Sequence, residues 1–137
     1  MSMTMTVINE EANGALGFGD FKSRDKIKFD GFEHGGHIYN VKTNCAVTRL
    51  ERDDALALES VPGCQVSNFV SDEKGLRFTA EGFADTHFTV GLAPSSTYEL
   101  LVDGKPLGLA KTNIAGKTSF TADLTDDRRD VEIRCIP

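Results

Sequence analysis

The pattern of residues 98–124 constrains the fold of this chain more than any other feature. An apolar run at residues 98–102 breaks at Asp103-Gly104, resumes, and breaks again at residues 113–116. From residue 120 to residue 124, apolar side chains then occupy every second position. Asp-Gly between two apolar strands is a strong hairpin signal, because Gly adopts the positive φ that tight primed turns require. The pattern therefore predicts three consecutive antiparallel strands and an all-β fold.

Short alternating segments separated by turns continue through the rest of the chain. In residues 37–42, Tyr39 and Val41 fall on one face of a predicted strand, while Ile38 and Asn40 fall on the other. About nine or ten such strands, with turns every 8–12 residues, predict an antiparallel β-sandwich or barrel. Residues 47–60 are the one helix-like alternative, but the period-two alternation of their leucines favours strands.

Length and charge limit the classes of protein that the chain can belong to. With 137 residues, the chain is long enough for one domain with its own core. We assign residues 14–137 to a single β-sandwich domain and residues 1–13 to a flexible arm or an edge strand. The net charge of −6 argues against nucleic acid as a partner. Because no run of 18 apolar residues occurs, the sequence predicts no transmembrane helix and no membrane partner.

The three cysteines show no metal-binding spacing. Cys45, Cys64 and Cys135 are far apart in the sequence, and no Cys-x2-Cys pair occurs. We interpret them as free thiols that are mostly buried, with a Cys45–Cys64 bridge left open as an alternative. In the alternating tail, Cys135 is predicted to face inward with Val131 and Ile133.

The late strands resemble a known class of domain. The pattern Tyr98-x-Leu-x-Val-Asp-Gly-Lys105, followed by Lys-Thr-Asn113, Gly-Lys-x-Ser-Phe120 and Val-Glu-Ile133, is similar to that of C-terminal β-sandwich accessory domains of bacterial polysaccharide-degrading enzymes. The segment before it, residues 92–98, resembles the entry to the late strands of fibronectin-like modules. The resemblance covers about residues 92–136 and implies an immunoglobulin- or fibronectin-like sandwich. Tyr98 is then expected to pack into the core with its hydroxyl bonded to the backbone.

The resemblance implies a function as well as a fold. It implies a non-catalytic accessory module of a carbohydrate-active bacterial protein, extracellular or at the cell surface, that positions an attached catalytic domain or contacts glycan weakly. The chain has no Trp and two Tyr, which argues against tight stacking on sugar rings. The residues that we expect to contact a ligand are Tyr39, Asn44, Asn113 and Lys117.

One histidine cluster supports a different function. His34 and His37 are separated by two glycines, and His87 is the third histidine of the chain. Imidazoles that converge can bind zinc, so a small metal-dependent enzyme that uses His34, His37 and His87 remains an alternative. The competing interpretation is a polar β-turn in which the glycines supply positive φ. The sequence itself predicts no resident cofactor.

A third function concerns association with other proteins. Exposed edge strands of sandwiches can pair with strands of other chains, so a protein-interaction or self-assembly module, including a homo-oligomer, is the second alternative. Ser60, Ser67, Ser95 and Ser96 lie outside any Gly-x-Ser-x-Gly context, which argues against a serine hydrolase. The acidic runs 53–54 and 123–130 lack the calcium-loop pattern and are interpreted as turns.

Overall fold

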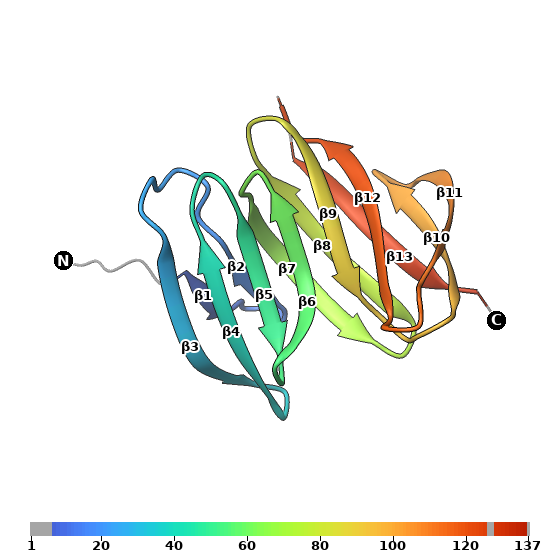
Figure 1. Ribbon diagram of the computed structural model, residues 1–137, viewed down its shortest axis with the longest axis horizontal. Coiled ribbons are helices and arrows are strands. Elements are labelled where there is room, and N and C mark those ends of the chain that lie inside the picture. Colours follow the sequence, from blue (N-terminus) through green and yellow to red (C-terminus); the bar gives the residue numbers. More distant parts are fainter. Residues whose placement is uncertain (1–6, 126–127, 137) are drawn as a thin grey trace.

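The computed structural model of the chain describes residues 7–125 and 128–136, and these residues form two antiparallel sheets and no helix (Figure 1). From edge to edge, the seven-stranded sheet consists of β1 (Ile8–Glu10), β2 (Leu16–Phe18), β7 (Gln65–Asp72), β8 (Gly75–Glu81), β13 (Arg129–Cys135), β10 (Thr97–Val102) and β11 (Lys105–Lys111). The six-stranded sheet consists of β12 (Lys117–Asp123), β9 (Asp85–Gly91), β6 (Ala55–Val61), β5 (Thr48–Arg52), β4 (His37–Thr43) and β3 (Ile27–His34).

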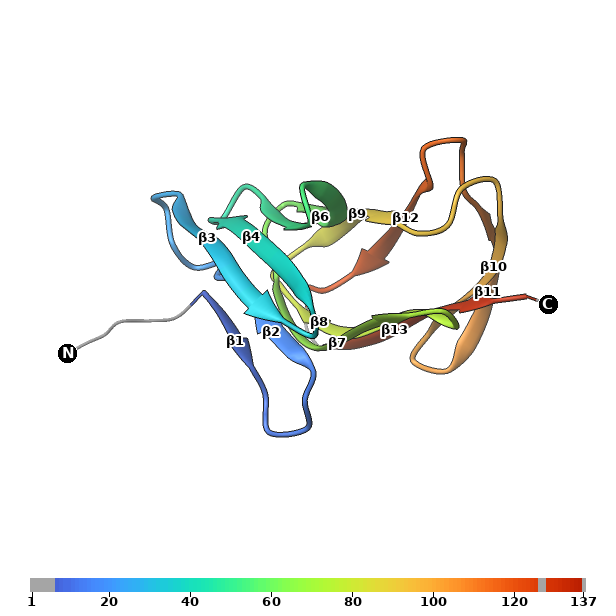
Figure 2. The ribbon, with the colours of Figure 1, turned by 90° about the horizontal axis from the view of Figure 1, so that it is seen from below.

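The two sheets pack as layers, and the chain crosses between them several times (Figure 2). An aromatic chain connects the layers: Phe78 of β8 lies 5.5 Å from Phe88 of β9 between ring centroids, and Phe88 stacks on Phe120 of β12 at 5.2 Å. Within the seven-stranded sheet, Phe78 also contacts Phe69 of the neighbouring strand β7, with 6.4 Å between ring centroids. The prediction of an all-β antiparallel sandwich is confirmed.

Alternation along the strands decides which side chains enter the core. In β4, Tyr39 and Val41 are 5% and 1% exposed, whereas Ile38 is 52% exposed. Residues 47–60 form the hairpin of β5 and β6, with Leu50 and Leu58 fully buried, so the strand interpretation of this segment is confirmed.

The Asp-Gly hairpin and all three predicted strands form, but the third strand joins the other sheet. Asp103 and Gly104 have φ angles of 52° and 78°, and they connect β10 to β11. β12 then leaves this sheet and pairs with β9 in the other layer. The three predicted strands are therefore confirmed as antiparallel strands, although they do not lie side by side in one sheet. The turn at residues 113–116 carries the chain across the sandwich instead of reversing it within one sheet.

The cysteines confirm the interpretation as free thiols but are less buried than expected. Cys45, Cys64 and Cys135 are all free thiols, so no Cys45–Cys64 bridge forms. Cys64 is buried, Cys45 is half-buried and Cys135 is exposed. The inward orientation predicted for Cys135 is wrong, because it is the last residue of β13 and lies at the end of the sheet, outside the core that buries Val131 and Ile133.

The N-terminal segment is partly described. Val7 and Ile8 are buried, and β1 pairs with β2 at the edge of the seven-stranded sheet. Residues 1–6 of the predicted arm lie outside the described residues. None of the described segments is a helix of the length and hydropathy needed to cross a bilayer.

Candidate functional site

The four residues expected to contact a ligand do not form one surface. Tyr39 lies near the start of β4 and Asn44 directly follows its end. Five residues of extended chain span about 17 Å, so the two residues lie at opposite ends of the sandwich. Asn113 and Lys117 flank the turn between β11 and β12, and Ala115 of this turn lines the same cavity as His37, at the Tyr39 end.

Both asparagines have a structural function in their turns. Asn44 Oδ1 accepts hydrogen bonds from the backbone N–H groups of Ala46 (3.0 Å) and Val47 (3.1 Å). Asn113 Oδ1 accepts them from Ala115 and Lys117, both at 2.9 Å. Asparagine side chains commonly stabilise turns in this way. These contacts account for both asparagines without a ligand.

The three histidines do not converge. His34 and His37 are register partners at the β3–β4 turn, where Gly35 and Gly36 have φ angles of 59° and 83°. His87 lies near the start of β9, opposite Val61 at the far end of β6. β4 and β9 begin at opposite ends of the molecule (Figure 1). No group of three or more His, Cys, Asp or Glu side chains within the described residues is arranged to hold a metal ion, so the predicted three-histidine site does not assemble.

Each of the two paired histidines instead contacts a carboxylate. His34 Nδ1 lies 2.8 Å from Glu10 Oε1 and joins β3 to β1 of the other sheet. His37 Nδ1 lies 2.6 Å from Asp53 Oδ2, in the turn between β5 and β6. The pKa of Asp53 is lowered, first by the hydrogen bond from the Ile38 N–H and then by the one from His37.

A cavity opens at this end of the sandwich, between the two sheets. It has a volume of about 380 Å³, and a second cavity of about 190 Å³ adjoins it. The two cavities share His37, Arg52, Phe69 and Ser71, and we call them together the end cleft. The volume of the larger cavity falls within the range of about 300–1,000 Å³ that is typical of small-ligand sites.

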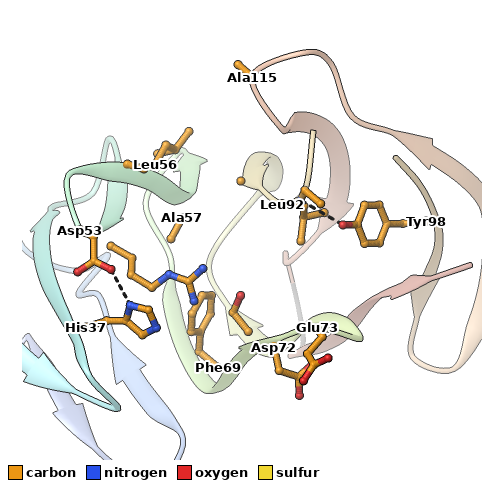
Figure 3. A pocket seen from close by; sticks show the side chains of 15 residues that line it. His37, Asp53, Leu56, Ala57, Phe69, Asp72, Glu73, Leu92, Tyr98 and Ala115 are labelled. Carbon is orange, nitrogen blue, oxygen red and sulfur yellow. Dashed lines mark hydrogen bonds and ion pairs between the residues drawn. The ribbon is translucent and has the colours of Figure 1, made fainter. Parts of the chain in front are cut away.

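Figure 3 shows the walls of the larger cavity. His37 and Asp53 lie on one side, and Leu92 and Tyr98 lie on the other. The Tyr98 hydroxyl accepts a hydrogen bond from the Ala93 N–H at 3.1 Å, which confirms the prediction for this tyrosine. The bond joins Ala93 to Tyr98 within the segment 92–98 that lines the end cleft.

Acidic side chains from the β7–β8 turn form a further wall. Asp72 and Glu73 are exposed and line the cavity. Asp72 Oδ1 accepts a hydrogen bond from the Lys74 N–H at 2.9 Å, which leaves its second oxygen available. Glu73 makes no hydrogen bond or ion pair with any residue in the described ranges. Both carboxylates can therefore accept hydrogen bonds from a ligand.

Arg52 is the functional candidate that the sequence interpretation missed. It is the last residue of β5, lies opposite Tyr39 and lines both cavities. The sequence contains a signal for this position, because Thr48 and Leu50 occupy alternate positions of β5 and both are buried. Extending that alternation by two residues places Arg52 on the same inward face.

Comparison of the chain with protein-family models, curated proteins and solved structures finds no match.

Proposed function

We propose that this chain is a non-catalytic β-sandwich module of a secreted or cell-surface carbohydrate-active bacterial protein, and that its end cleft contacts glycan. The observation that supports the proposal is the chemistry of the cleft walls. Arg52 offers N–H donors on one sheet, while Asp72 and Glu73 offer acceptors on the other. Sugars carry donor and acceptor hydroxyls on neighbouring carbons, so a wall of each kind suits them.

The late-strand pattern of residues 92–136 supports the same proposal. It also supports a sandwich of the immunoglobulin or fibronectin type. Segment 92–98 of that pattern supplies Leu92, Ala93 and Tyr98 to the cleft wall. A rigid sandwich with a cleft at one end can orient an attached catalytic domain relative to a polymer. Binding of this kind is weak, because Phe69 and Tyr98 are 3% and 4% exposed and offer little ring surface for stacking.

Binding to a broad polysaccharide and oligosaccharide array tests the proposal, with calcium, zinc and chelator conditions in parallel. The expected result is a signal for one glycan class that chelator does not remove. The double variant Asp72→Asn, Glu73→Gln should weaken that signal about tenfold through loss of charged acceptors. Glu81→Gln, which removes an exposed carboxylate outside the cleft, should leave it unchanged. Silence across the array contradicts the proposal.

A second function is favoured by one specific observation, on the edge strand β11. Leu107 and Leu109 are 59% and 64% exposed, and no described strand pairs with the outer side of β11. Such an edge can pair with the same edge of a second copy of this chain. Sedimentation equilibrium should then show a dimer that Leu109→Lys weakens, and a monomer at all concentrations contradicts this function.

A further inference from the structure

Arg52 occupies a strand position that normally holds a core side chain. Along β5, Thr48 and Leu50 are fully buried, and Arg52 is the next residue on the same face. Its register partner on β4 is Tyr39, which is 5% exposed. Because directly paired residues project to the same face of a sheet, the Arg52 side chain extends between the two sheets into the end cleft.

Arg52 has no acceptor among the described residues, and Arg49 of the same strand provides a direct comparison. Arg49, on the outer face of β5, donates to Glu59 at 2.9 Å and to Glu51 at 3.2 Å. Arg52 is half-buried and makes no hydrogen bond or ion pair with any residue in the described ranges. A guanidinium carries five N–H donors in a planar fork, and partial burial without acceptors is unfavourable. The fork is therefore available to a ligand.

The neighbouring carboxylate in the chain, Asp53, makes its contacts with β4 and not with Arg52. Asp53 Oδ1 accepts the Ile38 N–H at 2.9 Å, and Asp53 Oδ2 lies 2.6 Å from His37 Nδ1. The turn thus holds Asp53 toward β4. Arg52 contributes to the lowered pKa of Asp53 only through its charge, after the two hydrogen bonds.

The Tyr39 hydroxyl provides a second donor beside this fork. It makes no hydrogen bond with a described residue. Among the described side chains, Ser60 Oγ is the one fully enclosed polar atom without a partner. The Tyr39 hydroxyl is therefore not enclosed, and it reaches the solvent of the smaller cavity that Tyr39 lines. Arg52 lines the same cavity, so both groups face one space.

We infer that the end cleft binds an acidic sugar residue, with the sugar carboxylate on Arg52 and the sugar hydroxyls on Asp72 and Glu73. The inference rests on the proposed function and specifies its substrate class. A planar carboxylate matches the guanidinium fork with two parallel hydrogen bonds. Asp72 and Glu73 on the opposite wall disfavour a group with more negative charge, such as a phosphate dianion.

A paired panel of saccharides tests the inference on the whole 137-residue chain. The panel contains di- and trisaccharides of galacturonic, glucuronic and mannuronic acid, each with the neutral hexose counterpart of the same linkage. Titration calorimetry should detect at least one acidic member that binds at least tenfold more tightly than its neutral counterpart. Arg52→Gln should reduce that affinity about tenfold to a hundredfold, because it removes two charge-assisted hydrogen bonds.

Two further variants test whether affinity depends on the planar guanidinium of Arg52 or only on its positive charge. Arg52→Lys keeps the positive charge but loses the planar fork, so its affinity should fall between those of the unmodified protein and Arg52→Gln. Arg77→Gln removes the same charge from an exposed position on β8 and should leave the affinity unchanged. Equal melting temperatures of Arg52→Gln and the unmodified protein show that loss of binding is not loss of fold.

The outcomes separate this inference from the proposed function. Equal binding of neutral and acidic members, or acidic binding that Arg52→Gln leaves intact, overturns the acidic-sugar inference while the proposed function stands. Silence for every member of the panel, together with silence across the polysaccharide array, overturns both.

Discussion

Tyr39 and Arg52 lie directly opposite each other on β4 and β5, and both side chains face the second sheet. Tyr39 is a core residue, whereas Arg52 is a cation without an acceptor among the described residues. We therefore predict that Arg52→Met leaves the free energy of unfolding unchanged or raises it by about 0.5–2 kcal/mol, because an apolar side chain suits this partly buried position. Urea denaturation measures the difference.

The control for this substitution is on the same strand. Arg49→Met removes a guanidinium with two carboxylate partners, so it should lower the free energy of unfolding slightly, by up to about 1 kcal/mol for such half-exposed pairs. If Arg52→Met destabilises the protein more than Arg49→Met does, Arg52 has a structural function and its availability for a ligand is in doubt.

A second prediction concerns the stability of the β5–β6 turn in acid. The pKa of Asp53 is lowered below its usual value of 3.8, first by the Ile38 N–H and then by His37. A carboxyl group whose pKa is lower in the folded state stabilises the fold above pH 3.8 and loses this effect as the pH falls further. Asp53→Asn should therefore be less stable than the unmodified protein at neutral pH, and the difference should shrink as the pH falls below 3.8.

Asparagine is a suitable replacement at this position. Asp53 has a φ of 51°, and asparagine tolerates the left-handed region while keeping an oxygen acceptor for Ile38. Asp54→Asn removes a charge from the same turn without disturbing these hydrogen bonds, and it serves as the control. Thermal melts from pH 2 to pH 7 provide the comparison. If the melting temperatures of Asp53→Asn and the unmodified protein differ by the same amount at every pH, the lowered pKa of Asp53 does not explain the difference in stability.

The sequence predicted what depends on neighbours along the chain, and it failed where distant strands meet. The Asp103-Gly104 hairpin and the alternation of β4 follow from local turn chemistry and period two, and both are confirmed. The partner of β12 depends on packing across the sandwich, which no local pattern encodes. For the same reason, nothing local indicated that His87 would lie far from His37.

The end cleft illustrates the same limit. Its walls come from the β5–β6 turn, the β7–β8 turn and segment 92–98, which only the tertiary fold brings together. The alternation of β5 places Arg52 on the inward face, and this position could have been predicted by extending the alternation from Leu50 to Arg52. Arg52 has no acceptor within the described residues, and the neighbouring Asp53 contacts His37 of β4 instead, which the sequence does not reveal.

A third prediction compares two glycines that differ in their surroundings. A Cβ on Gly75 would lie 2.0 Å from the backbone oxygen of Ile133, and Gly75 has a φ of +129°. Gly75→Ala should therefore force β8 and β13 apart and cost about 3 kcal/mol or more. Gly104 has a φ of +78° but no atom within 4 Å of such a Cβ, so Gly104→Ala should cost only about 1–2 kcal/mol. Equal losses in chemical denaturation contradict the distinction.

The last prediction concerns the reactivity of the thiols. Burial raises the pKa of the Cys64 thiol to about 12, so almost none of it is thiolate at pH 8. Cys135 is exposed and is accessible to reagent. Ellman's reagent should therefore modify Cys135 rapidly in the native protein, and Cys64 only at the rate at which the protein unfolds. In the double variant Cys45→Ser, Cys135→Ser only the Cys64 phase should remain, and it should accelerate in urea. Rapid modification of Cys64 without denaturant, identified by peptide mapping, contradicts its burial.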